Sequence, residues 1–167
     1  MDIQIAGIVQ DSIVDGPGFR CAVFTQGCRH ACPGCHNPQS WDESGGARRD
    51  TADVLREILE NPLTDGITLT GGEPFLQAKA CAELAAGARE AGLNVWIYSG
   101  FTWDELAELA KTDDATARLL ALTDVLVDGR FIESEKTLGI KFRGSRNQRL
   151  IDVKKSREAG AAVTLPD

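Results

Sequence analysis

Short apolar runs typical of β-strands alternate along this chain with amphipathic stretches typical of helices. The expected strands are residues 19–25, 66–70, 93–98, 124–128, 149–153 and 161–165. The expected helices are residues 51–60, 77–91, 102–111 and 115–122, with a short helical turn after residue 153. Strands that alternate with helices form a mostly parallel sheet through βαβ crossovers. Six strands are too few to close an eight-stranded barrel, so we expect an α/β fold that is either a partial, open parallel β/α barrel or a doubly wound sheet.

The composition is that of an acidic globular chain. Its 167 residues fit a single domain, 1–167, of ordinary size. The net charge of −7 argues against a nucleic-acid partner, because nucleic-acid binders usually present a basic face. No stretch is long and apolar enough to span a membrane, and Asp2 stands where a signal peptide would be basic. The five cysteines are an odd number, which favours metal binding in a reducing cytoplasm over a disulfide framework.

The least ordinary residues of the sequence each follow a predicted strand. GCRHACPGC (27–35) follows the first strand, GGEP (71–74) the second, SGF (99–101) the third and DGR (128–130) the fourth. The carboxyl ends of parallel strands meet at one edge of the sheet, which is where α/β folds place their ligands. We therefore expect all four motifs to contribute to one site.

Cys28, Cys32 and Cys35 have the spacing C-x3-C-x2-C within a single loop. A structural zinc site needs four ligands around one ion, and His30 or His36 could supply the fourth. Such a site would be cramped, because zinc patterns usually pair two ligand couples that are a dozen or more residues apart. A [4Fe–4S] cluster can instead take three thiolates from one loop, which leaves its fourth iron open to a ligand that is not protein.

The remaining two cysteines are expected to be packing residues. Cys21 lies inside the first predicted strand, and Cys81 lies on an apolar helical stripe with Leu84, Ala85 and Ala88. A plain electron carrier with a [4Fe–4S] cluster would need a fourth protein ligand. Neither Cys21 nor Cys81 is expected close to the loop, which disfavours that alternative.

Taken together, the motifs resemble those of the radical S-adenosylmethionine (SAM) superfamily. The cysteine loop after the first strand and GGEP after the second carry this resemblance. DGPGFR (15–20), QGC and GCHNP (34–38) are similar to its glycyl-radical-enzyme activases. LVDGRF (126–131) and FRGSRNQRLIDV (142–153) are similar to the activating proteins of anaerobic ribonucleoside-triphosphate reductase. The resemblance covers residues 15–153 and implies a partial, open parallel β/α barrel of the radical SAM type.

The resemblance also implies cofactors and partners. A [4Fe–4S] cluster with three cysteine ligands would bind SAM at its open iron. Reductive cleavage of SAM would give a 5′-deoxyadenosyl radical, which takes a hydrogen atom from a glycine of the partner and leaves a glycyl radical there. The implied partners are the large subunit of anaerobic ribonucleoside-triphosphate reductase and a flavodoxin or ferredoxin as electron donor. The protein's part in such chemistry is position and electrostatics.

Site residues follow from the same resemblance. The cluster ligands would be Cys28, Cys32 and Cys35, and the SAM contacts would be Gly34, Cys35, His36, Gly71, Gly72, Glu73, Asp128 and Arg130. The backbone of the GGE motif would lie against the methionine part of SAM. Asp128 could accept hydrogen bonds from the ribose hydroxyls, and Arg130 could face the SAM carboxylate. Many superfamily members have an aromatic residue where this chain has Gly34, so we expect the Gly34 backbone and His36 to contact adenine instead.

Two further segments have candidate roles, and other functions remain open. Asp15 of DGPG would lie near the partner's glycine loop. The basic segment 141–149 is either a solvated loop or a patch that contacts the partner or the SAM carboxylate. Within the superfamily, the alternatives are an activase of the pyruvate formate-lyase type or a 7-carboxy-7-deazaguanine synthase. Outside it, the alternative is a zinc-stabilised interaction domain.

Overall fold

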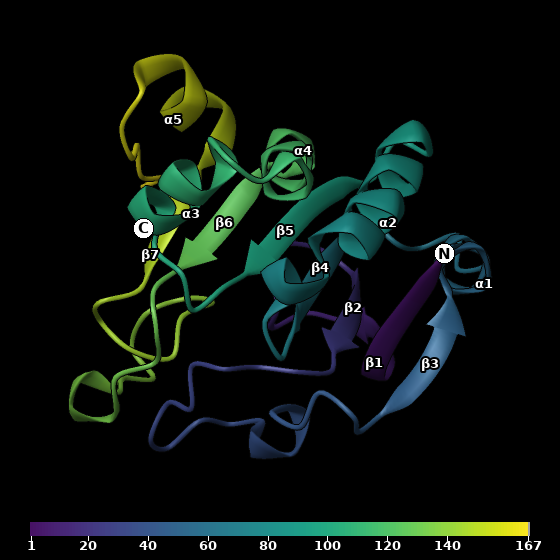
Figure 1. The fold of residues 1–167 in the computed structure, drawn as a ribbon, viewed down its shortest axis with the longest axis horizontal. Helices are drawn as coiled ribbons and strands as arrows, with labels where there is room; N and C mark the ends of the chain where they lie inside the picture. The colour runs from purple at the N-terminus through teal and green to yellow at the C-terminus, as the bar shows by residue number, and fades with distance from the viewer. Residues whose placement is uncertain (167) are drawn as a thin grey trace.

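In the computed structural model, which describes residues 1–166, the chain forms a seven-stranded mixed sheet covered by helices on one face (Figure 1). The strand order is β3-β1-β2-β4-β5-β6-β7. The strands are β1 (Asp2–Ser12), β2 (Arg20–Thr25), β3 (Ala47–Asp50), β4 (Gly66–Gly71), β5 (Asn94–Tyr98), β6 (Val125–Asp128) and β7 (Arg149–Asp152). The helices are α1 (Thr51–Leu59), α2 (Ala78–Glu90), α3 (Trp103–Ala110), α4 (Asp114–Leu122) and α5 (Val153–Ala159), with short 3₁₀ helices η1 (Pro38–Ser40), η2 (Pro74–Gln77) and η3 (Glu133–Glu135).

The centre of the sheet is as the sequence predicts. β2, β4, β5 and β6 are neighbours in that order, and each pair is parallel. The four helices expected along this part of the chain are present. α3 begins with a capping box, in which the Thr102 hydroxyl accepts from the Glu105 backbone and the Glu105 carboxylate accepts from the Thr102 backbone.

The edges of the sheet correct the predicted arrangement. β1 and β3 were not expected, and both pair antiparallel with their neighbours. β7 is antiparallel to β6, because the 129–148 connection contains only η3 and no crossover helix that could return the chain to a parallel start. Residues 161–165 form no strand and contribute only the bridge between Thr164 and Ile151. The mostly parallel α/β sheet is therefore confirmed, while the number of strands and their directions at both edges differ from the prediction, and within residues 1–166 the sheet ends openly at β3 and β7.

The two faces of the sheet are covered differently. One face carries the main apolar core, to which all five α-helices contribute. Along β5, Val95 and Ile97 point into that core, while Trp96 and Tyr98 point to the opposite face, as the two-residue period of a strand requires. That opposite face is covered by loop segments that include Phe142 and Leu165. A doubly wound sheet has helices on both faces, so that alternative is wrong for this chain.

Cys21 and Cys81 are core residues, as predicted. Both are fully buried in the helix-covered core. Burial raises the pKa of each thiol to about 12, because the thiolate loses hydration there. None of the helices in residues 1–166 is long and apolar enough to cross a membrane.

Candidate cluster and cofactor site

The four motifs predicted to share one edge of the sheet do so. The cysteine loop continues from β2, Gly72 and Glu73 follow β4, Ser99 follows β5, and Gly129 follows β6. Figure 1 shows the loop after β2 and the long segment after β6 on the side where the parallel strands end. The site is therefore built from loops that a rigid parallel sheet holds at fixed spacing.

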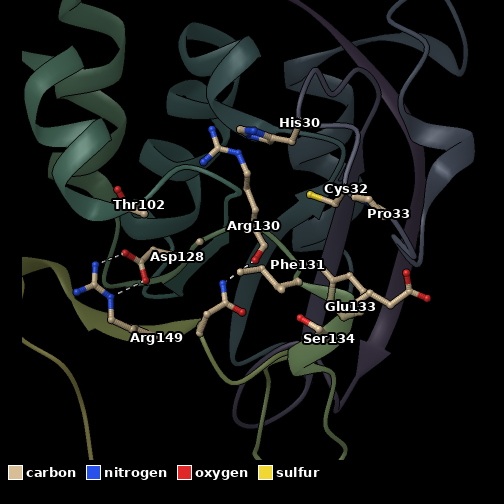
Figure 2. Close-up of a pocket in the computed structure, with 13 residues that line it drawn as sticks. His30, Cys32, Pro33, Thr102, Asp128, Arg130, Phe131, Glu133, Ser134 and Arg149 are labelled. Atoms are coloured by element: carbon tan, nitrogen blue, oxygen red, sulfur yellow. Dashed lines mark hydrogen bonds and ion pairs between the residues drawn. The ribbon is translucent and has the colours of Figure 1, made fainter.

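The three loop cysteines line one small cavity. Its volume is about 120 Å³, and its lining also includes residues from the ends of β4, β5 and β6. Beside it lies a larger cavity of about 980 Å³, which shares His30, Cys32, Gly129 and Phe131 with the first (Figure 2). A cavity of that size is typical of small-molecule sites. The arrangement thus offers a compact space beside thiols, next to a space that suits an organic cofactor.

The cysteine loop turns tightly between its second and third thiols. The Cys35 amide donates to the Cys32 carbonyl at 3.1 Å, and Gly34 between them has a φ of +76°, which favours glycine. The Asn37 amide donates to Cys35 Sγ at 3.4 Å. Burial raises the pKa of Cys28 and Cys32, as expected for thiols partly removed from water. Metal binding would instead lower the pKa of these thiols, because cysteine binds a metal as the thiolate.

The donor set fits an iron–sulfur cluster better than a single ion. No group of three or more His, Cys, Asp or Glu side chains in residues 1–166 is arranged to hold one metal ion. Zinc would require four ligands about 2.0–2.3 Å from one point, whereas the cysteines of a cubane each bind a different iron. His30, one candidate fourth zinc ligand, has its Nε2 committed to Glu73 at 2.6 Å.

Glu73 is the centre of a buried hydrogen-bond network. Its side chain is 1% exposed and accepts from four donors, which are His30 Nε2 at 2.6 Å, Ser99 Oγ at 2.9 Å, the Gly100 amide at 2.9 Å and the Phe75 amide at 3.1 Å. The His30 ring also packs edge-on against Phe101, with ring centroids 4.7 Å apart. Because His30 lies between Cys28 and Cys32, this network fixes the cysteine loop to the ends of β4 and β5.

The two glycines before Glu73 are required by neighbouring backbone. A Cβ on Gly71, whose φ is +92°, would lie 2.8 Å from Phe24 Cα, and one on Gly72 would collide with the Gly27 carbonyl. The Gly72 and Glu73 amides donate to the Thr25 and Gly27 carbonyls, each at 2.8 Å. Close packing against the start of the cysteine loop therefore explains these glycines without a ligand. Both glycines nevertheless line the small cavity.

Asp128 and Arg130 lie at the larger cavity, as Figure 2 shows, but in different states. Asp128 is 1% exposed and accepts from Arg149 Nη2 at 2.6 Å, Arg149 Nε at 3.1 Å and the Trp103 amide at 2.8 Å. Arg130 is half exposed and pairs with Glu105 at 3.3 Å. The Asp128 carboxylate is thus already bound by protein, whereas the Arg130 guanidinium keeps donors available to the cavity. Arg149, expected in a basic patch with its neighbours in segment 141–149, is instead the partner of Asp128.

Of the other predicted residues, Gly34 and His36 lie at the exposed rim of the site and Asp15 does not. Gly34 is exposed, and a Cβ at this position would lie 3.0 Å from the Glu133 side chain and 3.2 Å from the Phe131 ring. His36 is exposed, with its ring centroid 5.2 Å from that of Phe131. Asp15 is outside this rim, since it precedes β2 and its carbonyl accepts from Thr68 Oγ1 on the face opposite the helices.

Sequence reasoning missed several residues of the site. Ser99 and Gly100 were noticed only as part of a motif without a role, and His30 only as a zinc candidate. Trp41 and Tyr98 line the small cavity and were given no role. The signals for His30 and Trp41 were their positions, within the cysteine loop and just after it. The pairing of Asp128 with Arg149 joins two strands and left no local signal.

Comparison with known proteins agrees with this geometry. Residues 14–151 match the family described as a 4Fe-4S single cluster domain. The anaerobic ribonucleoside-triphosphate reductase-activating protein of Vibrio cholerae is 37% identical over 146 residues, which are 81% of this chain and 89% of that protein. The protein of the same name from Escherichia coli K12 is 34% identical, over 81% of this chain and 90% of that protein.

More distant matches are a phage protein and a solved structure. The protein of the same name from Enterobacteria phage T4 is 32% identical over 82% of this chain and 86% of its own length. The crystal structure of QueE from Escherichia coli overlaps 61% of this chain and 54% of that one at 18% identity, with a TM-score of 0.49, too partial a likeness to bear on fold or function. On the family match and the curated relatives, the chain belongs to the 4Fe-4S family of anaerobic ribonucleoside-triphosphate reductase-activating proteins.

Proposed function

We propose that this protein activates an anaerobic ribonucleoside-triphosphate reductase by generating a glycyl radical on its large subunit. A [4Fe–4S] cluster bound with SAM would supply the chemistry, since its electron cleaves SAM reductively and the resulting 5′-deoxyadenosyl radical takes a hydrogen atom from a glycine of the partner. The observation that carries the proposal is the gathering of three thiols from one loop around a compact cavity that opens beside a much larger one.

The chain's own residues have distinct roles in this proposal. Cys28, Cys32 and Cys35 would hold the cluster, and since no other cysteine within residues 1–166 lines their cavity, one iron would be left for SAM. Arg130 is the best placed charged side chain for the SAM carboxylate, because it lies at the larger cavity and its present partner, Glu105, is itself exposed.

The remaining proposed SAM contacts would act mainly through backbone. Gly34, Gly71 and Gly72 offer no side chain, and the Glu73 carboxylate is fully occupied within the protein. Asp128 already accepts hydrogen bonds from Arg149 and from the Trp103 amide. It could accept from ribose hydroxyls only with the lone pairs that these two donors do not use. His36 is exposed next to Phe131 and is available to adenine.

The first test is anaerobic reconstitution with iron and sulfide, followed by EPR of the reduced protein with and without SAM. We expect a cubane signal that changes when SAM is added, and its loss in Cys28→Ala, Cys32→Ala and Cys35→Ala. Cys81→Ala is the matched control, because that thiol is buried in the helix-covered core. Stoichiometric zinc without an iron signal would exclude the proposal.

The second test addresses the partner. The reconstituted protein, SAM and a reductant such as reduced flavodoxin are mixed with the large subunit of an anaerobic ribonucleoside-triphosphate reductase. We expect the doublet EPR signal of a glycyl radical, and 5′-deoxyadenosine in the same amount. SAM cleavage without a radical on this partner, but with one on a pyruvate formate-lyase, would reassign the chain to the alternative activase.

A further inference from the structure

Phe131 forms part of the wall that the two cavities of the site share. It follows β6 and lines both the small cavity with the cysteines and the larger one beside it (Figure 2). Within residues 1–166, no other phenyl, phenol or indole ring lines the larger cavity. The imidazole of His30 also lines it, but that ring is bonded to Glu73 and packs against Phe101. Phe131 is partly exposed and is thus the large aromatic side chain that can offer a face to a ligand there.

The Phe131 ring is held at two opposite edges by glycines. A Cβ on Gly34 would lie 3.2 Å from Phe131 Cε1, and a Cβ on Gly144 would lie 3.2 Å from Phe131 Cδ2. These two ring carbons are opposite each other in a phenyl group, so the cysteine loop and the segment before β7 meet the ring from two sides. The lack of a side chain at both positions lets the ring fit between them and fixes its orientation.

The backbone of Phe131 lies beside the second cysteine of the loop. Burial raises the pKa of the Cys32 thiol, and the Phe131 backbone, hydrogen-bonded to the sulfur, opposes that rise. The ring of His36, which follows the third cysteine, has its centroid 5.2 Å from that of Phe131. Phe131 is therefore adjacent both to the thiols and to the space that suits an organic cofactor.

We propose that Phe131 is the surface on which the adenine of SAM stacks. The inference rests on the proposed function, because it requires the larger cavity to bind SAM beside the cluster. A purine has a flat π-face, and an aromatic side chain can bind that face by stacking without a fixed set of hydrogen bonds. The ring occupies space that a side chain at position 34 would need, so Gly34 cannot itself supply such a contact.

The test compares a ligand that has the base with one that lacks it. The reconstituted protein is titrated anaerobically by calorimetry with SAM and, separately, with methionine, which has the same amino and carboxylate groups but no adenine. The cluster is kept oxidised so that SAM is not cleaved. In Phe131→Leu, we expect SAM to bind about tenfold to a hundredfold more weakly, because the stacked face is lost. Methionine binding should be unchanged.

Two further variants separate stacking from packing. Phe131→Tyr keeps the aromatic face and should bind SAM like the wild type. Ile132→Ala is the matched control, because Ile132 is the next residue, is exposed and lines the same cavity, and it should leave both affinities unchanged. Saturation-transfer NMR with 5′-deoxyadenosine gives a second readout. The adenine protons H2 and H8 should be saturated most strongly by the wild type and by Phe131→Tyr, and only weakly by Phe131→Leu.

Equal losses of SAM and methionine binding in Phe131→Leu would overturn the inference, because the ring would then support the cysteine loop instead of the base. Unchanged SAM binding in that variant would overturn it as well and would place the adenine elsewhere. Failure of the proposed function is a separate result, since iron analysis of the wild-type protein reports it. The NMR experiment needs only the chain and the nucleoside, so it decides the adenine contact even if no cluster assembles.

Discussion

Glu73 and Asp128 are two buried carboxylates at the carboxyl ends of β4 and β6, and they are held in opposite ways. Glu73 accepts from four donors, of which none is an arginine or lysine and three come from residues outside its own turn. Asp128 accepts mainly from one bidentate guanidinium, that of Arg149, whose side chain is 37% exposed. Glu73 therefore joins loops to each other within the protein, whereas Asp128 lies at the large cavity. The GGEP motif thus holds the scaffold together through Glu73, whereas Asp128 of the VDGR turn lies at the large cavity.

The largest effect is expected from Glu73→Ala. The change leaves His30 Nε2, Ser99 Oγ and the Gly100 amide without the acceptor that the Glu73 carboxylate provides, and the Glu73 side chain is only 1% exposed. Each buried donor that is left unsatisfied typically costs about 1–3 kcal/mol, so the free energy of unfolding should fall by several kcal/mol. Urea unfolding of the unloaded protein measures it, and iron uptake after reconstitution should fall with it, because the cysteine loop loses its attachment.

The conservative variant sharpens the test of Glu73. Glu73→Gln replaces one acceptor by an NH₂ group among donors, so it should also destabilise, although less than alanine. If Glu73→Gln and Glu73→Ala unfold like the wild type but lose SAM binding, the carboxylate would be a ligand group and the comparison with Asp128 would be reversed.

A smaller effect is expected from Asp128→Ala. Arg149 can regain hydration because it is partly exposed, so the main loss is the bond that Asp128 accepts from the Trp103 amide at the start of α3. We expect about 1–2 kcal/mol of destabilisation, similar to the loss of a helix cap. Iron uptake should be unchanged, and the affinity for SAM measured by calorimetry should fall. Loss of iron instead of SAM would show that Asp128 supports the cysteine loop.

The contrast between these sites explains what the sequence could predict. The parallel centre of the sheet follows from local apolar patterns such as those of β4 and β5, and the shared edge follows from strand direction alone. β7 was predicted as a strand, but its antiparallel direction was not, although the 129–148 connection has no helical pattern that would return the chain to a parallel start. β1 was missed although Ile3 and Ile5 alternate with polar residues. At the site, cysteine spacing identifies ligands because it is local. The bonds of Glu73 to Ser99 and of Asp128 to Arg149 depend on tertiary contact between strands and have no sequence spacing of their own.

The Cys81 thiol is a third buried acid and, unlike the two carboxylates, it lies inside the helix-covered apolar core. Its pKa rises from 9.0 to about 12 through burial, with a smaller contribution from Glu73. Between these two pH values the unfolded chain has lost the thiol proton and the folded chain still holds it, so stability falls as pH rises. The slope contributed is about 1.4 kcal/mol per pH unit. Between pH 9 and pH 12, we expect the free energy of unfolding of Cys81→Ala to fall less steeply with pH than that of the wild type, as measured by urea unfolding at each pH. Equal slopes in the two proteins would mean that the Cys81 thiol ionises in the folded state.

The smallest effect is expected from the exposed ion pair of the cysteine loop. Arg29 donates to Glu43 at 2.9 and 3.1 Å, but the two side chains are 70% and 53% exposed. Water and salt screen such a pair, and its geometry costs side-chain entropy, so Arg29→Ala should change neither urea unfolding nor iron uptake measurably. Because Arg29 lies between Cys28 and His30, this variant separates two attachments of one loop. A loss of iron in Arg29→Ala that matched the loss in Glu73→Ala would mean that the surface pair, rather than the buried carboxylate, holds the cysteines in place.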